Sequence, residues 1–308
     1  MQPLFAGKSF VLQKPLLNRL DKASRALLLP DNGEAIDFAH PAGEPALTSP
    51  DSVSWQVFKN PVSLFIGGVS AVILELAEPR VRTGVWKHSG FRHDPVRRLK
   101  RTGLAAMVTV YGPRSKAAAL IESVRRMHER VRGTTPAGEP YSATDPDLLN
   151  WVHATAAFGF LQAYHTYARP LSARERDRYY GEGGAAAKLY GVTKPAQSKA
   201  DIEALFGAMR DRLEPSPIVF EFLEIMRKTP VLPPMLRLMQ PFLVRAAVSI
   251  VPGSTRKILG LTEELGLHDW QRILISRAGA LADRIQLESS PAVQSCLRLG
   301  LPPDFLYR

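Results

Sequence analysis

The sequence predicts a mainly α-helical globular protein with an irregular N-terminal arm, and three observations support this fold class. The 308 residues are 45% hydrophobic and 22% charged, which is typical of a folded domain. From Trp55 onward, Ala- and Leu-rich runs follow helical spacing, and segments that alternate apolar and polar residues are almost absent. Before Trp55 the chain is rich in Pro, Gly and Asp. We therefore predict an arm over residues 1–54, packed on one helical domain over residues 55–308.

Two helices are expected in the first part of this domain. Residues 61–77 are apolar but contain two glycines and Glu75, and the stretch is short for a membrane span, so a buried core helix fits it better. The second helix begins at Asp94 and Pro95, because an aspartate caps a helix well and proline suits the first helical position. It is predicted to end near Val110.

The helix that follows carries the most informative histidine of the chain, His128. The chain breaks at residues 112–113, and we predict a helix from residue 115 to Arg132, capped by Gly133. His128 lies one turn after Val124 on the apolar stripe, so its imidazole is expected to face the core. A buried imidazole needs a partner, which is a carbonyl or hydroxyl group in most proteins and a metal ion in some.

A third helix, from Asp145 to Arg169, gathers aromatic side chains together with His153 and His165. Its pattern fits a core helix, and the alternative is the wall of a pocket in which His153 is a second metal ligand or a polar contact. Further on, residues 215–252 are apolar and interrupted by prolines. They are predicted to form short helices that cover the core or touch a membrane surface.

The formal net charge is +11, and most of the excess lies in one window. Over residues 80–116, ten basic residues accompany one acid, Asp94. Three interpretations stay open: a solvated basic face, a surface that binds anions, and inward-facing arginines that meet the carboxylates of a cofactor or substrate. Inside the window, Arg98, Arg101 and Thr102 stand at positions i, i+3 and i+4 of the predicted helix, so their side chains form one patch.

The sequence also disfavours several classes of protein. The single cysteine, Cys296, excludes an internal disulfide and a cysteine-rich metal site, and it favours a reducing compartment. The first residues lack the pattern of a secretory signal, so we expect a cytoplasmic protein, with membrane association as an open alternative. Phosphate-binding glycine loops, a GxSxG elbow and an HExxH motif are absent. Nucleic acid is not an expected partner, because the aromatic residues lie apart from the arginines.

Four segments give the chain a family likeness. They are WKHSGFRHDPVRRLKRTG (residues 86–103), YGPRSKAAALIESVRRMHERVRG (111–133), YSATDPDLLNWVHATAAF (141–158) and SIVPGSTRKILGL (249–261). Together they resemble the catalytic domain shared by MpaB-type oxygenases and the latex clearing protein, a rubber oxygenase, over roughly residues 55–290. The resemblance implies an all-α, globin-reminiscent fold that binds heme b and uses dioxygen to cleave a carbon–carbon double bond of an isoprenoid chain.

The resemblance also assigns site residues. His128 looks like the single helical histidine that ligates the heme iron in the rubber oxygenase, and Arg132 looks like the arginine four residues after it. Arg98, Arg101 and Thr102 match the spacing of an arginine, a lysine and a threonine near the distal side of the heme. Here arginine replaces the lysine at position 101, so a role that needs an ammonium group does not carry over.

The proposed catalytic glutamate of the rubber oxygenase has no counterpart at the matching position. The spacing places Arg82 there, and Glu75 and Glu78 lie nearby. A heme needs one axial ligand on a rigid helix, an apolar slot and cationic partners for its two propionates. The helix around His128 and the arginines provide these, with His153 as a further cofactor-binding candidate.

We therefore predict a heme b-dependent oxygenase that uses dioxygen on a hydrophobic small molecule of isoprenoid type. The alternative is a non-catalytic carrier or peripheral membrane protein that binds anionic lipid through the basic window and residues 215–252. The two predictions differ in one simple property, because a heme protein is coloured and a lipid carrier is not.

Overall fold

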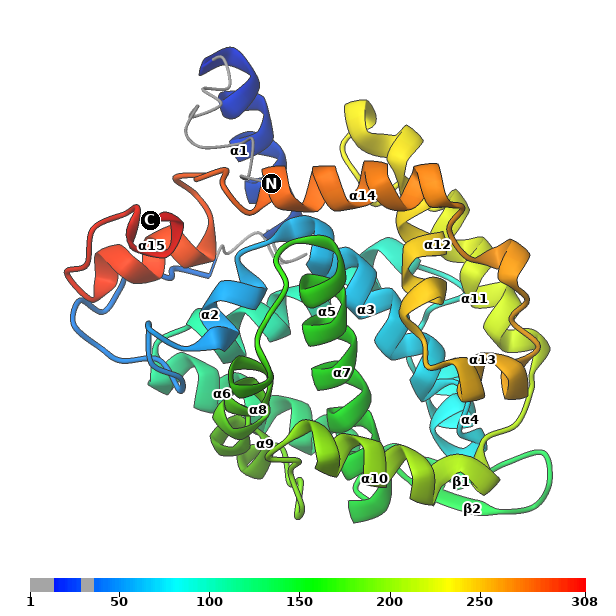
Figure 1. Cartoon of the computed structure of the whole chain (residues 1–308). Coiled ribbons are helices and arrows are strands. Elements are labelled where there is room, and N and C mark those ends of the chain that lie inside the picture. The colour runs from blue at the N-terminus through cyan, green and yellow to red at the C-terminus, as the bar shows by residue number, and fades with distance from the viewer. Residues whose placement is uncertain (1–13, 29–35) are drawn as a thin grey trace.

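The structure is a computed structural model, and it describes residues 14–28 and 36–308. It confirms the predicted fold class, because the described residues are mostly helical and their one sheet has two short strands (Figure 1). The α-helices are α1 (Lys14–Leu28), α2 (Val53–Phe58), α3 (Pro61–Glu75), α4 (Pro79–His88), α5 (Pro95–Tyr111), α6 (Arg114–His128), α7 (Pro146–Tyr167), α8 (Ala173–Glu182), α9 (Gly184–Leu189), α10 (Lys199–Met209), α11 (Pro217–Lys228), α12 (Gln240–Ile250), α13 (Gly253–Leu259), α14 (Asp269–Ala282) and α15 (Pro291–Arg298). The strands are β1 (Arg132–Thr134) and β2 (Pro140–Ser142), and the 3-10 helices are η1 (Arg210–Arg212), η2 (Pro234–Met239), η3 (Glu263–Leu265) and η4 (Phe305–Tyr307).

The centre of the fold is the pair α3 and α7, which cross at two glycines. A Cβ atom on Gly67 would lie 2.7 Å from Cα of Phe160, and a Cβ atom on Gly159 would overlap the carbonyl oxygen of Gly67. The two backbones therefore touch, which glycine allows and any larger residue prevents without movement of a helix.

Helix α3 is the core helix that the apolar residues 61–77 predict. Ile66, Ile73 and Leu74 on this helix are fully buried. No single helix in the described part of the chain is long and apolar enough to cross a membrane. By length and composition, α3 and α4 pass only as a pair that is bent by 115°.

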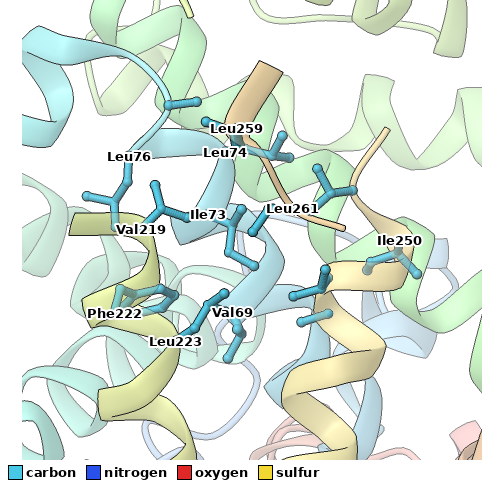
Figure 2. Close-up of a cluster of buried hydrophobic side chains, with 14 of the residues drawn as sticks. Val69, Ile73, Leu74, Leu76, Val219, Phe222, Leu223, Ile250, Leu259 and Leu261 are labelled. Atoms are coloured by element: carbon cyan, nitrogen blue, oxygen red, sulfur yellow. The ribbon is translucent and has the colours of Figure 1, made fainter. Parts of the chain in front are cut away.

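Apolar side chains fill both sides of the α3–α7 pair. One cluster lies between α3, α11 and α12 and contains Ile73, Phe222 and Leu223 (Figure 2). The second cluster contains Trp55 of α2 and Tyr111 of α5, whose rings meet edge to face with their centres 5.0 Å apart. Because α7 supplies residues to both clusters, it links the two halves of the core.

The proline-rich residues 215–252 form the short helices α11, η2 and α12, as predicted. Met226 of α11 and Val244 of α12 are buried, so these two helices cover the core. Leu236 and Leu238 of η2 are exposed. The region therefore combines a core covering with an apolar surface.

Helix α14 closes one end of the α3–α7 pair. Asn60, the residue before α3, donates a hydrogen bond of 2.9 Å to the carbonyl oxygen of Gly279 on α14. Gly279 also lies against the carbonyl oxygen of Tyr167, at the end of α7. The start of α3 and the end of α7 therefore lie together, so the two helices are antiparallel. The other end of the pair holds Glu75.

Described residues before Trp55 contact the helices that follow, and this segment is not wholly irregular. The structure forms helix α1 within it, which corrects the prediction of an irregular cap. From residue 36 onward the arm is held by the buried Arg298, whose guanidinium donates to the carbonyl oxygens of Phe38 at 2.6 Å and Glu44 at 2.8 Å. The predictions on residues 1–13 and 29–35 lie outside the described residues.

The predicted start of α5 is confirmed. The Asp94 carboxylate accepts a hydrogen bond of 3.1 Å from the backbone N–H of Arg97, and Pro95 occupies the first turn. The helix continues to Tyr111, where Gly112 ends it.

The predicted end of α6 is wrong. The helix stops at His128 instead of Arg132, and Gly133 lies in strand β1 rather than in a helix cap. The reason is a tertiary one, because residues 132–134 pair with residues 140–142 in an antiparallel sheet. Their backbone groups bond across this hairpin and not back to the helix.

We predict that Gly159→Ala destabilises the protein by roughly 2–4 kcal/mol, because the new methyl group would overlap the backbone of α3. Chemical denaturation followed by circular dichroism measures this change. Gly207→Ala on α10 is the matched control, since its Cβ would meet no atom within 4 Å. It should leave stability unchanged or raise it by up to about 1 kcal/mol. Equal stability of the two variants would contradict the close crossing.

Candidate functional site

The antiparallel hairpin of α5 and α6 brings Arg98 and His128 to the same end of the molecule. Both residues lie fifteen positions from Pro113, one before it and one after it. Antiparallel helices with a short connection place such positions opposite each other. A contact beside these two positions agrees with this arrangement: the Arg101 guanidinium on α5 lies 3.7 Å from Sδ of Met127 on α6. The start of α5 and the end of α6 therefore form one corner of the molecule.

His128 and His153 are half-buried imidazoles for which the described residues offer no hydrogen-bond partner. His93 is exposed, and four of the seven histidines do have such a partner: His40, His88, His165 and His268. In His165, Nδ1 accepts a hydrogen bond of 2.8 Å from the backbone N–H of Leu171, so this ring serves the fold. His128 and His153 are the two interior imidazoles that remain able to bind another group.

Burial keeps both of these imidazoles neutral. Burial lowers the pKa of His128, and the positive charge of Arg98 lowers it further. Burial alone lowers the pKa of His153 to about 4. Both rings therefore have the neutral form that binding to a metal requires.

Arg98 and Thr102 hold each other on successive turns of α5, in the patch that the sequence predicts. The Arg98 guanidinium donates to Oγ1 of Thr102, and the Thr102 hydroxyl donates to the backbone carbonyl oxygen of Arg98 at 2.8 Å. Because this bond uses the hydroxyl hydrogen, Thr102 positions the arginine, and Arg98 keeps N–H groups for another acceptor. Cζ of Arg98 also lies 5.5 Å from the ring centre of Phe91.

Glu75, the last residue of α3, is the carboxyl group whose charge acts on Arg98. Burial raises the pKa of Glu75 to about 7, although the positive charge of Arg98 acts in the opposite direction. The residue is only half-buried, and no described residue forms a direct ion pair with it. A carboxyl group with this pKa is partly protonated at neutral pH, so it can both accept and release a proton.

Glu78 has a different task, although it lies only three residues after Glu75. It is 1% exposed and accepts a hydrogen bond of 2.8 Å from the backbone N–H of Val81, which caps α4. It also pairs with Nε of Arg80 at 2.7 Å. Of the two glutamates, Glu75 is therefore the one that remains available for chemistry.

The basic window is used largely by the fold itself. Arg80 pairs with Glu78, Arg82 pairs with Glu214, and Arg92 makes two hydrogen bonds of 2.9 Å to Glu221. One of the three interpretations of the window is that its arginines meet carboxylates of a cofactor or substrate. These three arginines do meet carboxylates, but the carboxylates belong to the protein itself. Arg98 differs from them, because burial lowers its pKa and the carboxylate of Glu75 acts on it without a direct ion pair.

Arg132 and His153 belong to neither of the two helices that form the corner. Arg132 is exposed on β1 and is not one helical turn after His128, which corrects the predicted geometry of that pair. The His153 ring lies against the junction of α8 and α9, where a Cβ on Gly183 would be 3.7 Å from its Cε1 atom. Burial is the cause of its lowered pKa.

The spacing of the family resemblance does not find Glu75, because it counts residues along the chain and reaches Arg82 instead. A helical pattern does find it. Gly68, Val72 and Glu75 stand at positions i, i+4 and i+7 of α3 and share one half-buried face. Because an acid on such a face is costly to ionise, its presence indicates a functional group.

The fold is all-α, and a desolvated carboxyl group, a guanidinium and a neutral imidazole lie at one end of it, which are groups that can transfer protons and bind a ligand. Residues 55–284 match the family model described as ER-bound oxygenase mpaB/B'/Rubber oxygenase, catalytic domain. The match covers most of the chain, so the chain belongs to this family, as the four segments indicate. Membership implies an oxygenase that uses dioxygen and an organic substrate. No curated protein and no solved structure gives a significant match.

We predict that Glu75→Gln makes the protein more stable at pH 8 and leaves its stability nearly unchanged at pH 4. Because the pKa of Glu75 rises from 4.5 to about 7 on folding, the folded protein binds this proton more tightly than the unfolded chain does. Stability is therefore lost as pH rises through this window, and above it the ionised carboxylate costs at most about 3 kcal/mol. Thermal unfolding at the two pH values measures the effect.

Glu78→Gln is the matched control at the same turn between α3 and α4. It removes the partner of the buried Arg80 and weakens the cap of α4, so it should destabilise the protein by roughly 2–4 kcal/mol at pH 8. A loss of stability at pH 8 in Glu75→Gln as large as that in Glu78→Gln would show that Glu75 is not a desolvated free acid.

Proposed function

We propose that this protein is a heme b-dependent oxygenase that uses dioxygen to cleave a carbon–carbon double bond in a hydrophobic substrate of isoprenoid type. The observation that carries the proposal is the His128 imidazole, which is neutral, half-buried and without a hydrogen-bond partner among the described residues. The family supplies the oxygenase class. The heme, its ligand and the substrate are what we add.

The donor set fits a heme better than a metal ion held by protein ligands alone. No group of three His, Cys, Asp or Glu side chains able to hold a metal ion occurs in the described part of the chain. A porphyrin brings four nitrogen ligands of its own, so one imidazole is enough to complete the site. We assign this role to His128, with His153 as the second candidate. When bound, the heme would supply the activation of dioxygen.

Cations near the corner suit the two propionates of a heme. Arg101 lies beside Met127, the residue before His128, and Arg132 lies four residues after His128. Both arginines are exposed. We assign them to the propionates, because a guanidinium group binds a carboxylate through two parallel N–H groups.

The remaining residues of the site divide the chemistry between them. Arg98, held by Thr102, offers N–H groups to oxygen on which negative charge develops, and a well-placed donor of this kind lowers a barrier by about 3 kcal/mol. Glu75 accepts a proton from the substrate and returns it to the product, because its pKa of about 7 permits both steps.

The atoms of this reaction balance without another reactant. One carbon–carbon double bond and one dioxygen molecule are broken, and two carbonyl groups form. Each new carbonyl group receives one oxygen atom, so no external reductant is consumed.

The first test is an absorption spectrum of the purified protein, reconstituted with hemin. We expect a Soret band, and we expect His128→Ala to remove it. His93→Ala is the matched control, since His93 is exposed, and it should keep the band. Loss of the band in His153→Ala but not in His128→Ala would reassign the ligand. A wild-type protein that does not bind hemin would refute the proposal.

The second test is the pH dependence of dioxygen uptake with cis-polyisoprene latex. The rate should rise with pH and reach half of its maximum near pH 7, because the ionised form of Glu75 is the base. Glu75→Gln should lower kcat at least ~100-fold and keep the Soret band. Glu122→Gln, at an exposed position of α6, is the control and should keep the wild-type rate. An unchanged pH profile in Glu75→Gln would remove Glu75 from the mechanism.

A further inference from the structure

The outer face of α14 is apolar although it faces solvent. The helix buries Gln271, Ile275 and Gly279 against the domain. Its opposite side carries four exposed apolar residues at positions i, i+3, i+4 and i+11: Trp270, Ile273, Leu274 and Leu281. Trp270 is 58% exposed. A surface helix normally carries polar residues on this side, so the stripe is an unusual exposed apolar face of the described structure.

The 3-10 helix η2 extends this apolar face. It directly precedes α12, and the ring of Phe242 on α12 lies with its centre 5.7 Å from that of Trp270, so η2 is close to the start of α14 (Figure 1). Leu238 of η2 is 86% exposed, and Leu236 is exposed as well. We define the docking face as Leu236, Leu238, Trp270, Ile273, Leu274 and Leu281.

Arginines accompany the docking face. Arg237 lies between the two leucines of η2, and Arg277 lies on the exposed stripe of α14. Arg272 on α14 and Arg284 just beyond it are also exposed. None of these four arginines forms an ion pair with a carboxylate of the described residues. Because Asp269 is the one acidic residue of α14, the surface is both apolar and positively charged.

Helix α1 adds positive charge near the other end of α14. The backbone N–H of Ser289 donates to the carboxylate of Asp21 at 2.8 Å, which holds α1 beside the segment that follows α14. Figure 1 shows α1 projecting from the same side of the molecule as α14. Arg19 and Lys22 on α1 are exposed. The positive charge therefore extends beyond both ends of the helix.

We propose that the docking face binds the surface of a membrane that contains anionic phospholipids. An interfacial helix buries its apolar stripe among the acyl chains, places tryptophan at the level of the headgroups and brings arginines to the phosphates. A second copy of the chain fits less well. A symmetric dimer would bring together the four arginines of each copy with one acid of each α14, Asp269.

The docking face lies away from the candidate site. It belongs to the end of the α3–α7 pair at which Asn60 and Tyr167 contact Gly279, and Glu75 lies at the other end. Substitutions on the docking face therefore leave the groups of the site in place. The membrane proposal stands without the heme, and its test does not use activity.

Flotation of the full-length protein with lipid vesicles tests the proposal. We expect binding to vesicles of phosphatidylcholine with phosphatidylserine, weaker binding to phosphatidylcholine alone, and weaker binding at high salt. Arg272→Gln combined with Arg277→Gln should lower partitioning to anionic vesicles about 25-fold, at about fivefold for each arginine. Trp270→Ser combined with Ile273→Ser should lower it at least ~10-fold.

Leu297→Ser is the matched control, because Leu297 is a comparably exposed leucine on α15, outside the docking face. It should bind as the wild type does. Trp270 supplies a second readout, since it is the one exposed tryptophan of the four: Trp55 and Trp151 are fully buried and Trp86 is half-buried. Vesicle binding should shift the emission to shorter wavelength, and Trp270→Phe should still bind while losing most of this shift.

Three results would overturn the proposal. The first is wild-type binding to anionic vesicles by the variants of the docking face. The second is equal binding of the wild type to neutral and anionic vesicles at every salt concentration. The third is a dimer that the docking-face variants convert to a monomer in sedimentation velocity, which would assign the face to a second copy of the chain.

Discussion

The contact between the backbones of Gly67 and Gly159 sets the distance between α3 and α7, and the rest of the structure is arranged around this pair. Because no side chain separates the two helices at the crossing, they pack as one rigid centre with an apolar cluster on each side. One end of the pair carries Glu75. The other end receives Gly279 of α14, another glycine that lies against a backbone carbonyl oxygen. The candidate site and the docking face are thus at opposite ends of the same rigid pair.

At the site, burial shifts the pKa values of titratable side chains that form no direct ion pair with another described residue. Burial disfavours the charged forms of Glu75, Arg98 and His128, and no described residue forms an ion pair with Glu75. Glu78 and Arg80, only a few residues away, form a direct pair at 2.7 Å. At this turn the fold provides an ion pair for the carboxylate of Glu78 but not for that of Glu75. Because the carboxylate of Glu75 lacks such a partner, burial holds its pKa near neutral. Its proton can therefore exchange at neutral pH, as general acid–base chemistry requires.

The two proposals describe one enzyme. A hydrophobic substrate dissolves in the membrane that we assign to the docking face, so the protein would work where its substrate is concentrated. The arginines have separate tasks in this description: Arg80, Arg82 and Arg92 stabilise the fold, Arg98 serves the site, and those of α14 and η2 meet the lipid.

The sequence by itself determined the features that depend on residues within one or two helical turns. The cap of α5 at Asp94, the apolar core helix α3 and the patch of Arg98 with Thr102 are of this kind, because capping and side-chain spacing act locally. Tertiary structure decided the end of α6, since β1 pairs with β2 and takes Arg132 out of the helix. It also placed Glu75 and Glu78 in different environments, and it gave Arg82 and Arg92 their partners Glu214 and Glu221. Burial and ion pairing depend on segments more than a hundred residues apart, and no local pattern contains that information.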